Sequence, residues 1–284
     1  MAELLKGKAV VDSIAEEIGG RVSALDNRGA QPTLALLRIG ERPDDLSYER
    51  SAIKRAEALG LATRQIVLDE TASQSEIEAA IEAINADASV HGCLMFRPLP
   101  KQIDEQAVCD KLAIEKDIDG ISSLSLASVF MDGDRGYAPC TAAACVKMLD
   151  YYDIPVHGKH IVVVGRSLVI GKPVAMMLLR RHATVTLCHS RTEDLAATMR
   201  SADIVICATG RARMFGADCF SEGQTVLDVG INFDEEGTLC GDVDFAAVEP
   251  LVRAITPVPG GLGSVTTSIL MEHTVQAAEQ ELRD

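Results

Sequence analysis

One stretch restricts the fold of this chain more than any other: residues 160–181 read HIVVVGRSLVIGKPVAMMLLRR. The β-branched run 161–164 is too short for a helix and predicts a strand buried on both faces, as in a parallel sheet. The strand ends at Gly165, and Pro173 stands where the first turn of a helix tolerates a missing N–H group. The stretch therefore predicts a strand, a tight turn and the start of a helix.

A turn of this kind can bind an anion. Glycine lets the backbone approach a phosphate, and the start of a helix offers free N–H groups and the positive end of a dipole. The candidate residues are Gly165, Arg166, Ser167 and Gly171. The spacing differs from G-x-G-x-x-G, because Ser167 stands at the second glycine. A structural turn without a ligand is the alternative at this point.

The next strand carries the evidence about which dinucleotide would bind. Residues 184–187 form this predicted strand, and Ser190 and Arg191 follow it where a dinucleotide fold meets the adenosine ribose. NAD-binding folds often place a carboxylate there for the ribose 2′-hydroxyl. A hydroxyl and a guanidinium suit a 2′-phosphate instead, since arginine offers a charge and a fork of donors. The pattern favours NADP over NAD.

Two further buried strands are predicted at 203–208 and 225–229, and they end beside Gly210 and Ile231, two more candidates for cofactor binding. Four such strands alternating with helical patterns indicate a doubly wound sheet.

Composition narrows the class of protein. The chain has 284 residues, 47% of them hydrophobic, which is ample for one large or two medium domains. We expect a cytoplasmic protein, because no run reaches the length of a membrane span and the first residues mix charges unlike a secretory signal. Eight scattered cysteines without C-x-x-C predict neither a disulfide framework nor a metal site. A net charge of −15 argues against nucleic acid as a partner.

The first half of the chain also alternates helices and strands. Strands are predicted at 33–39, 62–68 and 92–96, and helices at 10–25, 46–59 and 73–84. Near the other end, Thr256–Gly263 is a glycine-rich loop before a predicted last helix at 267–282. Such a loop brings its backbone close to a ligand, or serves only as a hinge between domains.

At this point the motifs carry a resemblance. The chain resembles the methylenetetrahydrofolate dehydrogenase/cyclohydrolase (FolD) family over essentially its whole length, through ordered segments that read SYERSAIKRAEALG (47–60), PLPKQIDEQAV (98–108), EKDIDG (115–120), APCT (138–141), VVVGRSLVIGKPV (162–174), TLCHSRT (186–192), DVGIN (228–232), GDVDF (241–245) and TPVPGGLG (256–263).

The resemblance implies an α/β protein of two domains with a cleft between them. The folate domain would comprise residues 1–120 with 261–284, and a Rossmann-type NADP domain would comprise 140–260. Family members are usually homodimers. They transfer a hydride from 5,10-methylenetetrahydrofolate to NADP, and most then hydrolyse the methenyl product to 10-formyltetrahydrofolate.

Two departures from the family concern the hydrolysis step. The family has a catalytic lysine four residues after the tyrosine that Tyr48 matches, but this chain has Ala52 there. Phe96, followed by Arg97, replaces the glutamine that bonds this lysine. Lys54 lies about 240° around the helix from Tyr48, so it would reach the site only after a register shift such as a π-bulge.

The substrate candidates that the resemblance supplies come from both halves of the chain. Asp119 is retained, and a carboxylate suits the pterin edge, which presents adjacent N–H donors. The resemblance implies catalytic roles for Tyr48, Asp119 and, after such a shift, Lys54. The substrate-binding candidates are Tyr48, Ala52, Phe96, Arg97, Asp119, Pro259, Gly260, Gly261 and Gly263.

The sequence thus predicts an NADP-dependent methylenetetrahydrofolate dehydrogenase with weak or absent cyclohydrolase activity. Hydride transfer needs mainly positioning, whereas hydrolysis needs an activated water and stabilisation of shifting charge. Two alternatives stay open: a catalytically inactive paralogue that binds folate or nucleotide, and an oxidoreductase for another pterin-like substrate whose pocket Phe96 and Arg97 reshape.

Overall fold

The computed structural model describes residues 1–282, and the chain divides into two compact units. The first unit comprises Met1–Asp12 and Thr141–Thr266, and the second comprises Ser13–Cys140 and the chain from Thr267 onward. The expected domains differ from these units at both ends, because residues 1–12 and 261–266 lie in the first unit. Residues 283 and 284, which the expected range included, lie outside the described residues.

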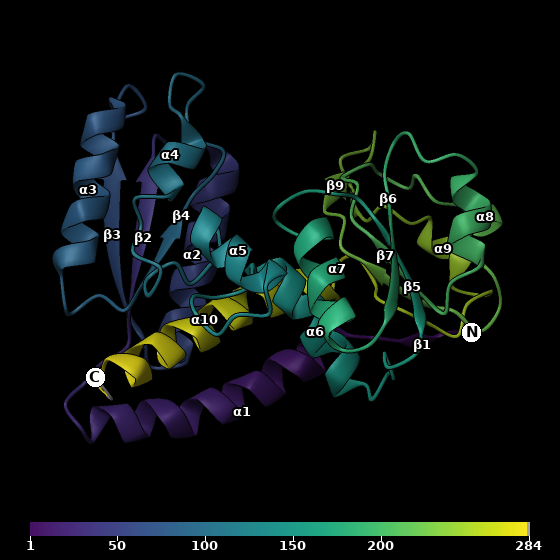
Figure 1. The fold of residues 1–284 in the computed structure, drawn as a ribbon, viewed down its shortest axis with the longest axis horizontal. Helices are drawn as coiled ribbons and strands as arrows, with labels where there is room; N and C mark the ends of the chain where they lie inside the picture. Colours follow the sequence, from purple (N-terminus) through teal and green to yellow (C-terminus); the bar gives the residue numbers. More distant parts are fainter. Residues whose placement is uncertain (283–284) are drawn as a thin grey trace. The chain divides into compact units, whose positions relative to one another are not determined.

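The first unit is built on a six-stranded sheet in the order β1-β11-β8-β7-β5-β6 (Figure 1). Every neighbouring pair in it is parallel. Its strands are β1 (Glu3–Leu4), β5 (His160–Val164), β6 (Thr184–Cys188), β7 (Ile204–Cys207), β8 (Thr225–Asp228) and β11 (Ala254–Ile255). A two-stranded antiparallel hairpin is added by β9 (Asn232–Phe233) and β10 (Leu239–Cys240).

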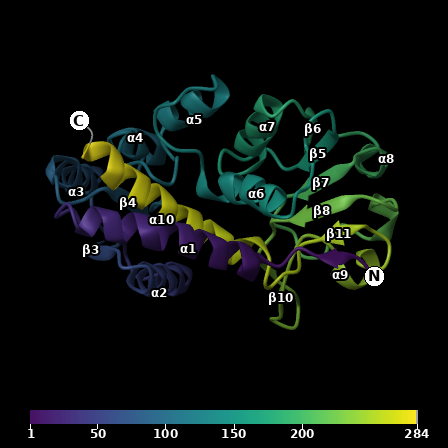
Figure 2. The same cartoon turned by 90° about the horizontal axis from the view of Figure 1, so that it is seen from below.

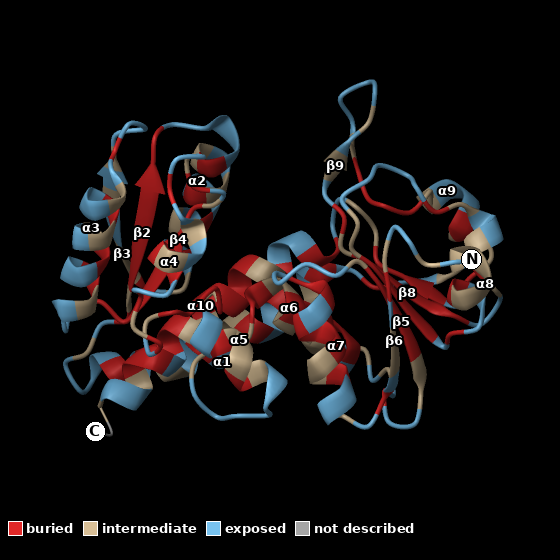
Figure 3. Ribbon diagram, turned by 45° about the horizontal axis from the view of Figure 1, so that its top comes forward, coloured by how far each residue is buried: buried red, intermediate tan, exposed pale blue. Residues whose placement is uncertain are grey.

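Helices cover both faces of this sheet, which explains its continuous apolar strands. The helices α8 (Leu195–Arg200) and α9 (Phe245–Val248) share one buried cluster with Val162 and Val164 of β5. The helices α6 (Cys140–Tyr151) and α7 (Gly171–Arg180) lie on the other face (Figures 1 and 2). The inner strands β5, β7 and β8 are therefore buried on both faces, as the β-branched sequence predicted, whereas the edge strand β6 is partly exposed (Figure 3).

The strand order sets the place where a ligand can bind. β5 pairs with β6 on one side and with β7 on the other, so the chain changes direction across the sheet at β5. In open parallel sheets such a switch point leaves a crevice at the carboxyl ends of the strands. The predicted turn after β5 lies at this edge.

The second unit has a three-stranded parallel sheet in the order β3-β2-β4. Its strands are β2 (Thr33–Ile39), β3 (Ala62–Leu68) and β4 (Gly92–Met95). The helices α3 (Gln74–Ala86) and α4 (Glu105–Cys109) pack on one face around Leu37, Ile81 and Val108. The other helices with residues in this unit are α1 (Gly7–Asp26), α2 (Pro43–Ala58), α5 (Ser123–Phe130) and α10 (Leu262–Glu281).

Within this unit α1 and α10 run side by side (Figure 2). Arg21 of α1 donates two hydrogen bonds to the Glu279 carboxylate of α10, at 2.9 and 2.8 Å. Two parallel bonds to one carboxylate fix the direction as well as the distance of the contact. The last helix thereby becomes part of a unit whose other residues lie more than a hundred positions earlier in the sequence.

Three helices begin earlier than the sequence predicted, and the first of them, α1, begins at Gly7 instead of residue 10. α2 begins at Pro43, because proline suits the first helical position and Asp44 and Asp45 place negative charge at the positive end of the dipole. Residues 43–45, which the predicted helix did not include, are therefore helical. α10 begins at Leu262, inside the glycine-rich loop. α3 begins within one residue of its predicted start, where Ser73 and Glu76 form a capping box.

Candidate functional site

The turn after β5 is built by close backbone contacts at its two glycines. Gly165 has a φ of +127°, and a side chain there would meet the Ala208 carbonyl oxygen at 2.1 Å. A side chain on Gly171 would meet the Gly165 carbonyl oxygen at 1.9 Å. Both glycines are thus required by the turn itself, which brings the start of α7 to the ends of β5 and β7. Arg166 and Ser167 are exposed between them.

The turn after β6 presents its polar side chains outward. His189 holds it, because its backbone N–H donates to Thr192 Oγ1 at 2.9 Å and its Nδ1 accepts from the Arg191 N–H at 3.1 Å. Ser190 and Arg191 are exposed. The guanidinium can therefore reach an anion beside the carboxyl end of β6.

A buried aspartate, Asp242, joins the two loops that carry the remaining candidates for cofactor binding, although the sequence had not singled it out. The Asp242 carboxylate accepts hydrogen bonds from the backbone N–H groups of Gly210 and Arg211, at 3.2 and 2.9 Å. It also accepts from Asn232 Nδ2 at 2.9 Å. The loops that carry Gly210 and Ile231 are therefore held by one carboxylate. The acidic residues of the GDVDF segment were the available signal in the sequence.

A second buried aspartate supports the first. Asp228 accepts from the backbone N–H groups of Gly230, Asp242 and Val243. Burial raises the pKa of the Asp228 carboxyl to about 7, against these hydrogen bonds, which favour its charged form. Glycines at 230 and 241 leave the room that both carboxylates occupy.

The glycine-rich loop belongs to the first unit and lies beside a cofactor candidate. A side chain on Gly263 would reach Ile231 Cδ1 at 3.5 Å. The N-terminal segment also holds this loop in place, because the Gly7 N–H donates a hydrogen bond to the Gly260 carbonyl oxygen at 2.8 Å. Pro259, Gly260, Gly261 and Gly263 are therefore placed with Ile231 inside one unit.

In the second unit, the structure brings Tyr48, Phe96 and Asp119 together. The rings of Tyr48 and Phe96 meet edge to face, with centroids 6.0 Å apart. Ala52 is fully buried in α2, and Phe96 is 4% exposed. Burial raises the pKa of Tyr48 well above its usual range, and the charge of Asp119 adds to the effect, so its hydroxyl stays protonated.

Lys54 does not join this group. α2 is a continuous α-helix from Pro43 to Ala58, with no π-bulge between Tyr48 and Lys54. Lys54 is exposed, whereas the buried residues of the helix are Asp45, Glu49, Ala52 and Ala56. The register shift that would carry its amine towards Tyr48 is absent.

The carboxyl of Asp119 has an unusual electrostatic environment. Burial raises its pKa to about 6, while the nearby positive charge of Arg97 acts in the opposite direction. Arg97 is itself held by Glu105, whose Oε1 lies 3.5 Å from Arg97 Nη1. At neutral pH the carboxylate is thus charged, poorly solvated and ready to accept hydrogen bonds from a ligand.

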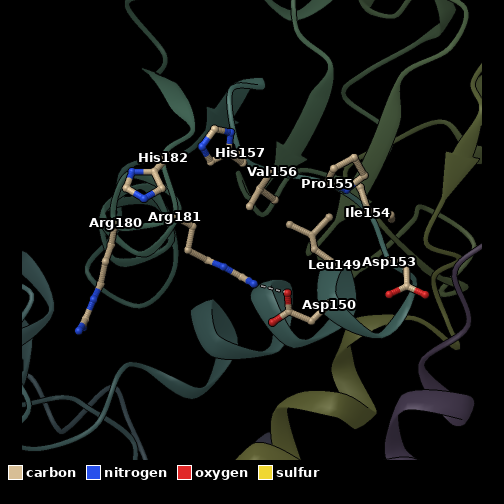
Figure 4. A pocket seen from close by; sticks show the side chains of 10 residues that line it. All are labelled: Leu149, Asp150, Asp153, Ile154, Pro155, Val156, His157, Arg180, Arg181 and His182. Carbon is tan, nitrogen blue, oxygen red and sulfur yellow. Dashed lines mark hydrogen bonds and ion pairs between the residues drawn. The ribbon is translucent and has the colours of Figure 1, made fainter.

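A separate pocket of about 480 Å³ lies in the first unit (Figure 4). α6 and α7 both end at it, and Arg180, Arg181 and His182 surround the end of α7. Arg181 points to Asp150 of α6 and pairs with it. Basic side chains at helix C-termini balance the partial negative charge there, so a structural role accounts for this pocket. None of the predicted site residues lines it.

Over residues 1–282, no cluster of histidine, cysteine or carboxylate side chains could hold a metal ion. Over the same range, no helix combines the length and the apolar character needed to cross a membrane.

Comparison with known proteins yields two family models that together match most of the chain. Residues 5–119 match the catalytic domain of tetrahydrofolate dehydrogenase/cyclohydrolase. Residues 139–282 match the NAD(P)-binding domain of the same family.

Individual proteins are similar over the full length of the chain. A bifunctional protein FolD from Carboxydothermus hydrogenoformans is 49% identical over 281 residues, which cover 98% of each sequence. The crystal structure of FolD from Campylobacter jejuni is 37% identical and superposes with a TM-score of 0.96 over 99% of both chains. FolD from Trypanosoma brucei, crystallised with NADP and an inhibitor, is 32% identical with a TM-score of 0.94, over 100% of this chain and 99% of that one.

Proposed function

Because the chain belongs to the tetrahydrofolate dehydrogenase/cyclohydrolase family, we propose that it oxidises 5,10-methylenetetrahydrofolate with NADP and has little or no cyclohydrolase activity. NADP accepts a hydride from the methylene carbon, and the product is the 5,10-methenyl cation. The chain's own residues bind and orient the two reactants, which is most of what this step requires.

The cofactor half of the proposal rests on the carboxyl edge of the six-stranded sheet. The N-terminus of α7 provides backbone donors for the diphosphate, and Arg191 provides a cation for the 2′-phosphate. Asp242 holds the loops of Gly210 and Ile231, which would flank the rest of the dinucleotide. The bound NADP in the Trypanosoma brucei relative supports this cofactor.

The folate half rests on Asp119 and Tyr48. The Asp119 carboxylate would accept the paired N–H donors of the pterin edge, and its poor solvation makes such bonds strong. The protonated Tyr48 hydroxyl would donate rather than act as a base. Neither residue has to exchange a proton during hydride transfer.

The state of α2 is the observation that carries the prediction about hydrolysis. At the position of the family's catalytic lysine, Ala52 is fully buried, and Phe96 packs against Tyr48 where a glutamine would bond that lysine. Arg97 supplies charge near Asp119, but a guanidinium does not serve as the base that activates water. The one lysine of α2, Lys54, is exposed and does not replace this amine.

The charge of Arg97 favours one second candidate function. An oxidoreductase for another pterin-like substrate would use Asp119 in the same way, with Arg97 and Phe96 selecting a different substituent. Comparing turnover of 5,10-methylenetetrahydrofolate with turnover of other reduced pterins distinguishes the two candidates.

We further propose that the protein is a cytoplasmic homodimer. The eight cysteines are all free thiols, and seven are buried, which suits a reducing compartment. The dimer is the usual state of the family, and light scattering of the purified protein would test it.

The decisive experiment measures both activities of the purified chain. NADP reduction with 5,10-methylenetetrahydrofolate should be robust. The enzyme's rate of 5,10-methenyltetrahydrofolate hydrolysis should be lower than its dehydrogenase rate by at least about a hundredfold. One positioned acid–base group usually contributes a factor of this size. Robust hydrolysis would refute the cyclohydrolase part, and absence of NADP reduction would refute the dehydrogenase part.

A further inference from the structure

Asp119 lies in a turn that is held at several points within the second unit. The Asp117 carboxylate, fully buried, accepts hydrogen bonds from the backbone N–H groups of Ile121 and Ser122, both at 2.9 Å. Gly120 has a φ of +63°, and a side chain there would meet the Tyr137 carbonyl oxygen at 2.5 Å. The backbone that follows Asp119 is therefore held by two hydrogen bonds and by a close backbone approach at Gly120.

The peptide group that precedes Asp119 is held through its carbonyl oxygen, which belongs to Ile118. His273 Nδ1 lies 2.8 Å from the Ile118 carbonyl oxygen, and Cys140 Sγ lies 3.3 Å from the same atom. A carbonyl oxygen can only accept, so the Nδ1–H group of His273 donates to it. The Cys140 thiol lies within reach of the same oxygen and also hydrogen-bonds the Asp119 carboxylate. These two side chains come from the middle of α10 and the start of α6 and meet at the oxygen that directly precedes Asp119.

The position of the His273 ring is determined by its neighbours. Nδ1 must carry a proton, because the Ile118 oxygen offers none. The ring of Tyr137 packs on the imidazole with centroids 4.9 Å apart and a tilt of 37°. The histidine thus has a fixed tautomer at Nδ1 and a fixed ring plane, which is the arrangement expected of a residue that orients another group.

We propose that His273 is a positioning residue for the pterin-binding carboxylate: its Nδ1–H fixes the Ile118 carbonyl and, through that peptide, the direction in which Asp119 presents its oxygens. This inference rests on the proposed role of Asp119 in folate binding. A carboxylate that must match two adjacent N–H donors tolerates little rotation, so a small shift of the turn weakens both bonds together. His273 itself touches neither reactant in this scheme.

Three variants separate the donor from the ring. His273→Asn keeps an N–H donor two bonds from Cβ, where Nδ1 stands, but removes the ring. His273→Phe keeps a ring for Tyr137 but removes the donor. His273→Ala removes both and cannot clash with its surroundings. Gln276→Ala, at an exposed position of the same helix, is the matched control.

The experiment measures the KM for 5,10-methylenetetrahydrofolate, the kcat and the Kd for tetrahydrofolate and NADP on the full-length chain. The Phe and Ala variants should raise the folate KM and Kd by about tenfold, the usual loss for one hydrogen bond. The Asn variant should recover most of the folate affinity, and NADP affinity should stay the same in all three. The melting temperature should instead depend on whether a ring is present, so the Phe variant should melt at a higher temperature than the Asn and Ala variants.

The other outcomes each overturn the inference. Equal loss in the Asn, Phe and Ala variants would show that packing matters and the donor does not. An unchanged KM in the Phe and Ala variants, or a parallel loss of NADP affinity, would show that His273 does not act through the folate site. If the Phe variant does not fold, the comparison of Ala with Asn decides alone.

A second comparison tests the route through Asp119. In an Asp119→Ala background, His273→Phe should change the Kd for tetrahydrofolate less than twofold, because the group it positions is gone. An undiminished effect would overturn the proposed route. Failure of the wild-type chain to bind tetrahydrofolate or reduce NADP would refute the proposed function itself, so the wild-type measurement separates the two failures.

Discussion

At the scale of single residues, two carboxyls of the candidate site differ in how their charge is supported. Asp242 is buried, surrounded by N–H donors, and joins two loops. Asp119 is half-buried, its hydrogen bonds come from Cys140, and desolvation raises its pKa to about 6. A carboxylate that is left poorly solvated destabilises the folded protein and binds a ligand's donors more strongly.

The first prediction concerns how the charged form of Asp119 lowers the free energy of unfolding. Its pKa rises from the ordinary 3.8 to about 6 on folding, so the folded protein holds this proton more tightly than the unfolded chain does. The resulting gain in the free energy of unfolding is fully present below about pH 3.8 and is lost as the pH rises through 6. Asp119→Asn should therefore raise the thermal midpoint at pH 8, and the gain should disappear towards pH 4.

The same variant should raise the folate KM or abolish turnover while NADP binding stays intact. Melting curves across this pH range, with steady-state kinetics at pH 8, check both effects. A destabilised variant with normal folate kinetics would show that Asp119 only shapes its turn.

The second prediction concerns the choice of dinucleotide. Arg191→Ala should weaken NADP binding by about 1–3 kcal/mol, the usual size of a charged hydrogen bond, and weaken NAD far less. The side chain is exposed at the end of β6, so the change should leave the fold intact. Titration calorimetry with both dinucleotides measures the difference, and equal losses would place Arg191 away from the 2′-phosphate.

At the scale of secondary-structure elements, α2 and the end of β4 decide which chemistry is available. The sheet-facing side of α2 is packed with small and acidic side chains, including Ala52 and Glu49. Arg38 of β2 pairs with Glu49 at 3.1 Å in the buried space beneath the helix. The helix is thus anchored beside Tyr48. Under the proposed function, Ala52 and Phe96 are the two positions at which this pocket lacks a lysine and its hydrogen-bond partner.

The third prediction tests that reasoning. The double change Ala52→Lys and Phe96→Gln should introduce hydrolysis of 5,10-methenyltetrahydrofolate, because the lysine gains a hydrogen-bond partner and the phenyl ring no longer fills the space. Ala52→Lys alone should do less, since its amine would face an apolar ring.

Lys54→Ala serves as the control and should leave both activities as they are, because Lys54 is exposed. Hydrolysis that is present in the unmodified chain and lost in this control would identify Lys54 as the catalyst.

The fourth prediction concerns the glycine-rich loop. A side chain on Gly261 would meet the Pro257 carbonyl oxygen at 2.6 Å, so Gly261→Val should destabilise the first unit as well as reduce activity. Gly263 has only Ile231 Cδ1 nearby, at 3.5 Å, and lies in the first turn of α10. Gly263→Ala should therefore keep or raise stability, because alanine favours a helix.

Kinetics then show whether the loop meets a reactant. A fall in activity in the stable Gly263→Ala variant supports contact with the substrate or cofactor. Full activity in this variant would leave the loop with a structural role only.

At the scale of the whole molecule, the two units are continuous through helices. Both α1 and α10 begin in the first unit and end in the second. Unfolding of either helix in one unit therefore removes helical structure that continues into the other unit. We therefore expect the two units to unfold together.

The fifth prediction uses that continuity. NADP at a hundred times its Kd should stabilise the chain by about 2.7 kcal/mol and shift a single thermal transition upward by roughly 5 °C. NAD at the same concentration should shift it less. Calorimetry that shows two transitions, with only one moved by NADP, would mean that the units unfold separately.

The sequence alone determined the features that depend on local physics. Runs of β-branched residues between helical periods predicted the parallel strands, and the spacing of Gly165, Gly171 and Pro173 predicted the turn that leads into α7. The sequence also shows Ala52 four positions after Tyr48, where the resemblance implies a lysine.

Tertiary structure decided the features that depend on contacts between distant residues. The two-residue strand β1 is too short to show a period, and only its pairing with β11 places residues 1–12 in the first unit. Asp242 and His273 each bond to groups more than thirty positions away, at Thr209 and Ile118. Periodicity reports which face of an element is buried, but it carries no information about which partner covers that face, and the partner determines the chemistry of a buried polar group.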